Sequence, residues 1–189
     1  MSPSSDDTPA TPESQPPGSR IVIREEQPAD VSGIAKVNRL AFERNGEAIL
    51  VDRLRGDAHW LHSFVAVEQG QVVGHILFTR VAIDSAGAPP PVAAIGPMAV
   101  LPSHQRNGIG SRLIRAGLDA CGRSGHVAVF VLGWPDYYGR FGFRPASSFY
   151  GISCEFDVPS EAFMALELSR GALAGVGGVV RYAPAFQDV

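Results

Sequence analysis

The sequence has few cysteines, no surplus of positive charge and no long apolar run. Two cysteines among 189 residues, Cys121 and Cys154, exclude a disulfide framework, and neither lies in a metal-binding Cys/His cluster. We interpret both as small buried residues of a reducing compartment, and we expect no metal site. Sixteen Lys and Arg against nineteen Asp and Glu give a net charge of −3, which excludes a broadly basic nucleic-acid binder. The longest apolar runs, 92–101 and 126–132, are too short to span a bilayer, so we expect a cytoplasmic protein with no membrane contact.

The remaining composition is that of one ordinary globular domain. Hydrophobic residues make up 45% of the chain and charged residues 19%, and the length suits a single core. Residues 1–19 contain five prolines and five serines but no aromatic residue. Such a segment cannot bury enough apolar surface to offset its ordering entropy. We therefore predict a disordered tail over 1–19 and a single folded domain over 20–189.

Hydrophobic periodicity and turn residues predict a mixed α/β domain. Asp30 is the predicted N-cap of the first helix, Trp60 lies in a predicted loop, and residues 68–71 are a predicted hairpin turn. Pro97 lies inside a strand, where it removes one ladder donor, so we expect that strand to bulge or splay there. The predicted strands are 21–24, 64–67, 72–83, 92–100, 127–132, 162–168 and 176–182, and the predicted helices are 30–42, 47–55, 108–123 and 135–141.

The most informative segment is LPSHQRNGIGSRL, which joins the strand at 92–100 to an amphipathic helix. The first amides of a helix are unpaired and carry a partial positive charge, and small residues let an anion approach them. Gly108 and Gly110 therefore predict a phosphate or pyrophosphate site. The dinucleotide fingerprint is excluded because Leu113 stands at its third glycine, and the P-loop is excluded because no GK[ST] is present. What remains is QxxGxG, from Gln105 to Gly110.

This motif, placed after a strand interrupted by proline, resembles the coenzyme A motif of the GCN5-related N-acetyltransferase (GNAT) family. A second match lies downstream, where Tyr138 stands four residues before Gly142-Phe143 on a predicted short helix after the next strand. The resemblance covers about residues 20–150 and extends to the final predicted strands. It implies the acyl-CoA N-acyltransferase fold, a mixed, centrally splayed β-sheet flanked by helices.

The resemblance also implies acetyl-CoA as co-substrate, with its pantetheine arm in the opening of the sheet. Backbone groups of the strand would pair with the arm, and successive amides of the loop would hold the pyrophosphate. Arg106 has two interpretations that stay open, a charge contact to the nucleotide end or a solvated loop arginine. The cofactor-binding residues carried over are Met98, Ala99 and Val100 for the arm, and Arg106, Asn107, Gly108, Ile109, Gly110 and Ser111 for the pyrophosphate.

The implied reaction transfers the acetyl group directly to a primary amine. A base must take a proton from the ammonium, and a donor must protonate the leaving thiolate. Tyr138 matches the family's donor position; the alternative is a tyrosine that only packs or hydrogen-bonds the sulfur. Glu47 is our candidate base, because it begins the helix on the implied acceptor side. Glu43, Asp52 and Asp136 are weaker candidates, and Asp136 is also a candidate helix N-cap.

Two functions from different classes remain open. The first is an N-acetyltransferase acting on a small-molecule or peptide amine, and the second is a non-catalytic acyl-CoA-binding sensor. A longer acyl donor is a third, weaker option. We expect segments 43–62 and 146–160 to form the acceptor side and His75 to be structural. His104, just before the coenzyme motif, has two open interpretations: it lines the loop or is only a turn residue. The apolar C-terminal strands are suited to a homodimer contact.

Overall fold

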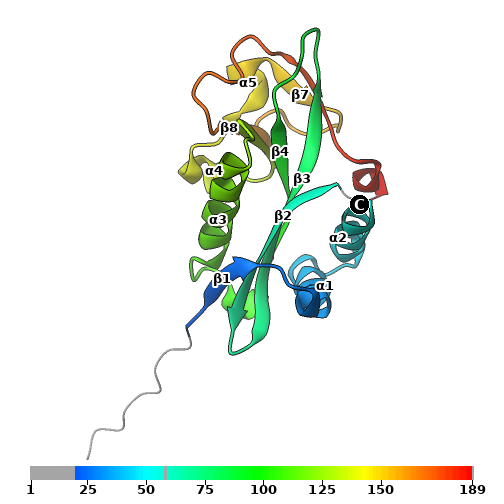
Figure 1. Cartoon of the computed structure of the whole chain (residues 1–189), viewed down its shortest axis with the longest axis vertical. Helices are drawn as coiled ribbons and strands as arrows, with labels where there is room; N and C mark the ends of the chain where they lie inside the picture. The colour runs from blue at the N-terminus through cyan, green and yellow to red at the C-terminus, as the bar shows by residue number, and fades with distance from the viewer. Residues whose placement is uncertain (1–19, 58, 189) are drawn as a thin grey trace, which may run out of the picture.

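The computed structural model describes residues 20–57 and 59–188, so the tail predicted at 1–19 lies outside the described residues (Figure 1). Within that part of the chain, no helix is long and apolar enough to cross a membrane. The strands are β1 (Val22–Glu25), β2 (Trp60–Glu68), β3 (Gln71–Asp84), β4 (Val92–Val100), β5 (Ala128–Leu132), β6 (Arg144–Pro145), β7 (Ile152–Cys154), β8 (Phe163–Glu167) and β9 (Gly178–Arg181). The α-helices are α1 (Val31–Phe42), α2 (Gly46–Gly56), α3 (Ile109–Arg123), α4 (Pro135–Tyr138) and α5 (Ala146–Tyr150), and short 3₁₀ turns lie at Pro28–Asp30, Pro102–His104, Gly139–Phe141 and Pro184–Asp188.

One mixed sheet organises the molecule, with strand order β1-β2-β3-β4-β5-β8-β6. Strands β1 to β4 are antiparallel neighbours, whereas β4 and β5 are parallel and are connected through α3. Strand β9 pairs with the far end of β3 and with β7. The predicted mixed α/β fold, a sheet flanked by helices, is confirmed.

The sheet opens between β4 and β5. Their pairing runs from Val92 opposite Ala128 to Ile95 opposite Val131 and stops there, while β4 continues to Val100 with β3 as its neighbour. The β3–β4 register shifts at the same place. Both changes begin at Gly96-Pro97, because Pro97 has no N–H to donate. The predicted bulge and splay are therefore confirmed.

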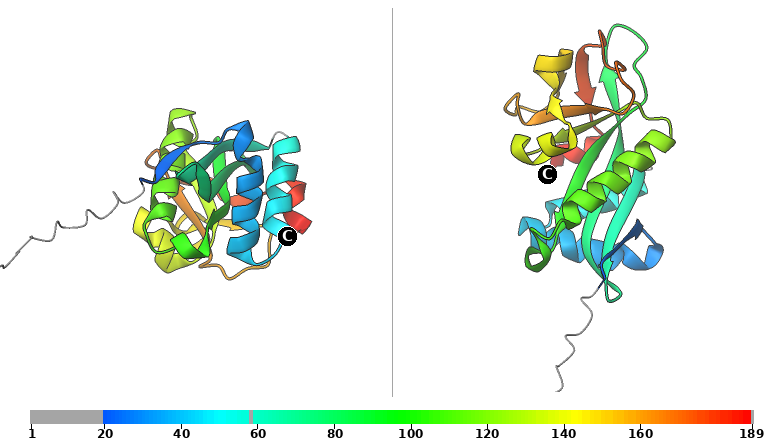
Figure 2. Two further views of the ribbon diagram at one scale, coloured as in Figure 1. Left: turned by 90° about the horizontal axis from the view of Figure 1, so that it is seen from below. Right: turned by 90° about the vertical axis from the view of Figure 1, so that its left-hand side faces the viewer.

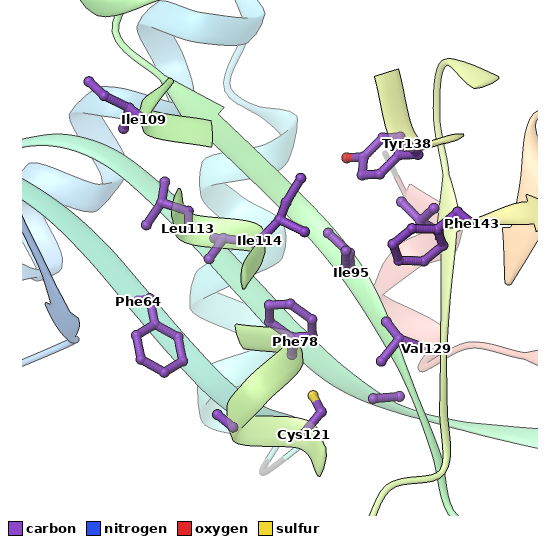
Figure 3. Close-up of a cluster of buried hydrophobic side chains, with 14 of the residues drawn as sticks. Phe64, Phe78, Ile95, Ile109, Leu113, Ile114, Cys121, Val129, Tyr138 and Phe143 are labelled. Atoms are coloured by element: carbon purple, nitrogen blue, oxygen red, sulfur yellow. The ribbon is translucent and has the colours of Figure 1, made fainter. Parts of the chain in front are cut away.

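Helices cover both faces of the sheet, α1 and α2 on one face and α3 on the other (Figures 1 and 2). Side chains alternate across a strand, so β3 supplies both layers. Phe78 packs in the cluster that includes Leu113 of α3 (Figure 3). Leu77, its neighbour in the chain, packs instead with Leu54 of α2. A third cluster lies under the C-terminal elements, where Phe130 stacks on Phe163 with ring centroids 5.4 Å apart.

Two local predictions are wrong in detail. Asp30 occupies the N-cap position of α1, but its side chain makes no cap hydrogen bond there. Its carboxylate instead accepts hydrogen bonds from Arg24 and from the Gln27 amide, and the Arg24 hydrogen bond lowers its pKa. Trp60 begins β2 rather than lying in a loop, because the long β3 strand supplies pairing partners beyond the apolar run predicted at 64–67.

The hairpin turn predicted at 68–71 is confirmed, since β2 ends and β3 begins on either side of Gln69-Gly70.

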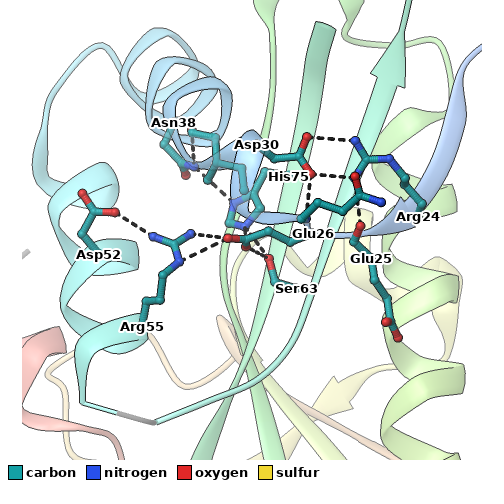
Figure 4. Close-up of polar contacts among 11 residues, drawn as sticks. Arg24, Glu25, Glu26, Asp30, Asn38, Asp52, Arg55, Ser63 and His75 are labelled. Carbon is teal, nitrogen blue, oxygen red and sulfur yellow. Dashed lines mark hydrogen bonds and ion pairs between the residues drawn. The ribbon is translucent and has the colours of Figure 1, made fainter. Parts of the chain in front are cut away.

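A chain of buried polar side chains connects α1 to β2 and β3 (Figure 4). The Ser63 hydroxyl donates to Glu26, whose carboxylate also accepts from Arg55. Since Ser63 has one proton to give, His75 Nε2 must carry a proton and donate to Ser63 Oγ at 3.0 Å. His75 Nδ1 then accepts from the Asn38 amide at 3.2 Å. Complete burial lowers the pKa of His75 to about 3, so it is a neutral structural residue, as expected.

Candidate active site

A cleft of about 620 Å³ lies where α1, the end of β4, the following loop and α4 meet. We call it the glycine-loop cleft. Its floor includes the part of β4 that lies beyond the pairing with β5, so backbone groups of that strand face an opening rather than a neighbouring strand. The residues that line it are Ala41, Phe42, Met98, Ala99, Val100, His104, Gln105, Arg106, Gly108, Ile109, Gly110, Ser111, Tyr137 and Arg140.

The loop before α3 turns its backbone through two left-handed residues. Arg106 has φ +64° and Gly108, the N-cap of α3, has φ +76°. The side chain of Gln105 donates to the Val100 carbonyl at 3.1 Å and ties the loop to the end of β4. The start of a 15-residue helix therefore faces the cleft with its unpaired amides. This arrangement suits a phosphate group.

The structure brings together eight of the nine residues predicted to bind the coenzyme. Asn107 is exposed on the same loop but does not line the cleft. The Ile109 side chain is buried in the core, so only its backbone is available to a ligand. A Cβ atom added to Gly110 would lie 2.5 Å from the Tyr137 hydroxyl, so α4 itself requires a small residue there. Arg106 is exposed and lines the cleft, and both of its interpretations stay open.

A second cavity, of about 670 Å³, adjoins the first. We call it the aromatic cavity. The two share Phe42, Met98 and Tyr137 as lining residues, so they meet at the end of β4. The other lining residues are Arg44, Glu47, Leu50, Ile95, Gly96, Pro97, Val131, Leu132, Gly133, Trp134, Tyr138, Phe156, Val158, Tyr182 and Phe186.

Tyr138 stands in the wall of the aromatic cavity at the end of α4. It is 7% exposed and packs edge-on against Tyr137 and Phe143, with centroid distances of 5.1 and 5.7 Å. Burial, with a smaller contribution from Tyr137, raises the pKa of its hydroxyl. The phenol therefore keeps its proton at neutral pH, as a proton donor must. Figure 3 shows this hydroxyl directed away from the neighbouring core side chains of Phe143 and Val129.

Glu47 lies in the first turn of α2 and also lines the aromatic cavity. Its carboxylate is buried and accepts from Arg44 Nε at 3.0 and 3.1 Å. The weaker candidates do not line this cavity: Glu43 is exposed, Asp52 pairs with Arg55, and Asp136 is exposed in the first turn of α4. Asp136 is not an N-cap, because Trp134 holds that position.

Sequence reasoning missed several lining residues, of which four are the most informative. Arg140 donates to the Tyr137 carbonyl and lies over the Tyr137 ring at 4.6 Å; its place in the motif YYGRFGF was the available signal. Trp134 is 82% exposed although it lines the aromatic cavity, and an exposed tryptophan before the tyrosine motif could have been noticed. Tyr182 and Phe186 come from the C-terminal segment, which gave no local signal.

Comparison with known proteins identifies the family. Residues 22–146 match the family model of the acetyltransferase (GNAT) domain. The chain belongs to the GNAT family. The matched region of this GNAT domain runs from β1 to the start of α5 and contains the loop before α3 and the tyrosine of α4.

Relatives of known structure have the same fold as this GNAT domain. YhbS of Escherichia coli, named as an uncharacterized N-acetyltransferase, is 36% identical over 163 residues, which cover 86% of this chain and 96% of YhbS. The crystal structure of YhbS holds CoA and superposes with a TM-score of 0.85 over 92% of this chain and 95% of that one, at 34% identity. A GNAT acetyltransferase of Brucella melitensis, solved with acetyl-CoA, has a TM-score of 0.73 and 34% identity over 89% and 99% of the two chains.

Proposed function

We propose that this protein transfers the acetyl group of acetyl-CoA to a primary amine. The observation that carries the proposal is the meeting of the two cavities at Met98 and Tyr137. One cavity ends at the start of α3, where an anion is favoured, and the other contains a protonated phenol and a buried carboxylate. Family membership and the CoA and acetyl-CoA bound to YhbS and to the Brucella protein support the donor.

The glycine-loop cleft fits the coenzyme. An extended arm can pair with the unpaired side of β4 at Met98, Ala99 and Val100, as an added strand would. The diphosphate is received by amides of the loop and the first turn of α3. Acetyl-CoA supplies a thioester, whose carbonyl carbon is the electrophile and whose thiolate is the leaving group.

The residues of the aromatic cavity supply the proton movements that the reaction needs. The acceptor arrives as an ammonium ion and must lose a proton before its nitrogen can form the new C–N bond. Glu47 takes this proton, directly or through a water molecule. As the C–S bond breaks, Tyr138 gives its proton to the sulfur, consistent with a phenol whose pKa burial keeps high. The attacking nitrogen then loses its second proton to the Tyr138 oxygen, directly or through water, which restores the phenol. The products are an amide and a free thiol.

Thiol release from acetyl-CoA, measured across a panel of amines, tests this function. We expect amine-dependent release of free thiol together with formation of an acetylated amine, detected by mass spectrometry. Coenzyme binding without thiol release under every amine would instead favour the sensor function.

The coenzyme site has its own test in Gly108→Val. A β-branched residue cannot hold φ +76° without strain, so the loop should lose its anion-binding shape and affinity for CoA should fall at least about tenfold. The matched control is Gly87→Val, in the loop after β3, where a Cβ meets nothing within 4 Å. Unchanged CoA affinity in Gly108→Val, measured by calorimetry, would remove the loop from the site.

A further inference from the structure

The aromatic cavity has a mainly apolar lining that is rich in aromatic side chains. Seven aromatic side chains surround it: Phe42, Trp134, Tyr137, Tyr138, Phe156, Tyr182 and Phe186. Among the described residues that line it, Arg44 and Glu47 alone carry formal charge, and they pair with each other. The remaining wall is aliphatic, from residues such as Leu50 and Val131. Recognition in this cavity therefore depends on apolar contact, with one charged position.

The single charged position admits one ammonium group. The Glu47 side chain is 6% exposed and fixed in the wall, whereas the Arg44 side chain is 60% exposed. An incoming ammonium can replace the guanidinium at Glu47, and Arg44 then returns to water without leaving a buried charge unpaired. A second ammonium on the same molecule would find no second carboxylate in the lining and only the weaker attraction of the ring faces. A polyanion would face a carboxylate and the negative faces of the rings.

The mouth of the cavity offers a flat apolar surface. Trp134 is 82% exposed and Phe42 is 37% exposed, yet both line the cavity. Because both side chains also line the cavity, their exposed area is continuous with its apolar lining, and a contiguous apolar surface of this kind is typical of a binding site. A ring that stacks on Trp134 removes apolar area from water on both partners.

We propose that the acceptor is an arylalkylamine, a primary amine with one positive charge on a short chain attached to an aromatic ring. This inference rests on the proposed function and narrows its substrate class. The ammonium lies against Glu47, the chain passes Tyr138, and the ring lies among the aromatic side chains near Trp134.

The first test compares the kcat/KM values of four acceptors: phenethylamine, n-propylamine, spermidine and a tetrapeptide with a free N-terminal alanine. Burial of the ring should make phenethylamine better than n-propylamine by about tenfold or more. It should also exceed spermidine, whose further charges have no counter-charge in the cavity. Preference for spermidine, n-propylamine or the peptide overturns the proposed class.

The second test removes the surface at the mouth. Trp134→Ala should raise the KM for phenethylamine by about three- to tenfold and should raise the KM for n-propylamine by much less, because n-propylamine has no ring to stack on Trp134. The matched control is Trp60→Ala, an equally large change at a partly exposed tryptophan of β2 that lines neither cavity. An equal rise in KM for both amines, or the same rise in the control, contradicts a ring-binding role for Trp134.

A binding measurement separates this inference from the proposed function. Phenethylamine is titrated by calorimetry into protein saturated with CoA, which needs no turnover. Saturable binding heat that becomes weaker in Trp134→Ala supports the acceptor class. If no amine then releases thiol, the acetyltransferase proposal is overturned but the acceptor class is not. Thiol release with other amines, together with no heat from phenethylamine, overturns the acceptor class and leaves the acetyltransferase standing.

Discussion

At the residue scale, burial decides the proton state of Tyr138. The aromatic neighbours that enclose it raise the pKa of its hydroxyl, which makes it a poor base and a suitable donor to a leaving thiolate. Tyr137 has a different place: its hydroxyl lies close to the position that a Cβ at residue 110 would occupy, and its ring lies under Arg140. The two adjacent tyrosines are therefore not interchangeable.

Tyr138→Phe should lower kcat by about 10²-fold, the usual contribution of a positioned acid, with CoA affinity nearly unchanged. The ring still fills its place, so the variant should fold. The matched control is Tyr150→Phe in α5, which lines neither cavity. Steady-state kinetics measures kcat and calorimetry measures CoA affinity. An unchanged kcat would show that Tyr138 has a packing role only.

His75 illustrates how one buried group makes stability depend on pH. Its pKa is about 3 in the folded protein because of burial, against about 6.5 when the chain is unfolded and solvated. Between these two pKa values the unfolded state binds a proton at His75 and the folded state does not. The contribution of His75 to the free energy of unfolding is therefore complete above pH 6.5 and is lost as pH falls toward 3. Protonation would also break the bond from Asn38, because Nδ1 could no longer accept.

Urea unfolding should show a loss of about 2 kcal/mol between pH 7.5 and pH 5 from this residue. His62 and His126, whose pKa values burial also lowers, add to the slope with the same sign. His75→Gln should thus be less stable at pH 7.5 but show a shallower pH dependence than the natural protein. His59→Gln, at a half-buried loop position, is the control. An unchanged slope in His75→Gln would mean that His75 takes up a proton in the fold.

At the element scale, the sequence predicted those helices and strands that have a clear hydrophobic pattern of their own. Helix α3 and strand β5 were found within a residue or two, because one has a helical apolar stripe and the other a continuous apolar run. Strands β6 and β7, helix α5 and the turn at Pro184–Asp188 were missed. They are short and exist through contacts with β8, β9 and α2 rather than through their own pattern.

The glycine-loop cleft and the aromatic cavity also differ in how far the sequence could predict them. The glycine-loop cleft is built largely from one continuous segment, 98–111, so a motif could report it. The aromatic cavity collects side chains from α1, α2, β4, α4 and the C-terminal segment, and only the fold brings these together. Glu47 could be suggested from its place in the family order, whereas Phe186 could not.

Helix α3 packs closely on the sheet through Gly117, which provides a test at this scale. A Cβ at Gly117 would overlap the fully buried Phe78 ring, so Gly117→Ala should destabilise the protein by about 1–3 kcal/mol. The same substitution at Gly122, on the same helix with nothing within 4 Å, should raise stability by up to about 1 kcal/mol. Opposite signs in urea unfolding are expected, and equal effects would contradict the close approach of α3 to β3.

At the scale of the whole molecule, the opening of the sheet leaves the β4–β5 junction dependent on a short run of pairing. Only the stretch from Val92 to Ile95 joins the two strands among the described residues. Beyond it, β4 presents backbone groups to the glycine-loop cleft instead of to a strand. A ligand that pairs with these groups completes a strand edge, so coenzyme binding and global stability are linked.

CoA at 100 times its Kd should therefore raise the free energy of unfolding by about 2.7 kcal/mol, as mass action requires for a ligand that binds only the folded state. Hydrogen exchange measured at individual amides tests where the coenzyme and its pantetheine arm lie. Hydrogen exchange should slow with CoA at 106–111 and at those amides of 98–100 that face the cleft rather than β3. With adenosine 3′,5′-bisphosphate, which lacks the pantetheine arm, it should slow only at 106–111. Stabilisation by CoA with no protection of 98–100 would show that the arm lies elsewhere, because a strand edge that gains a partner cannot exchange as fast as one that faces water.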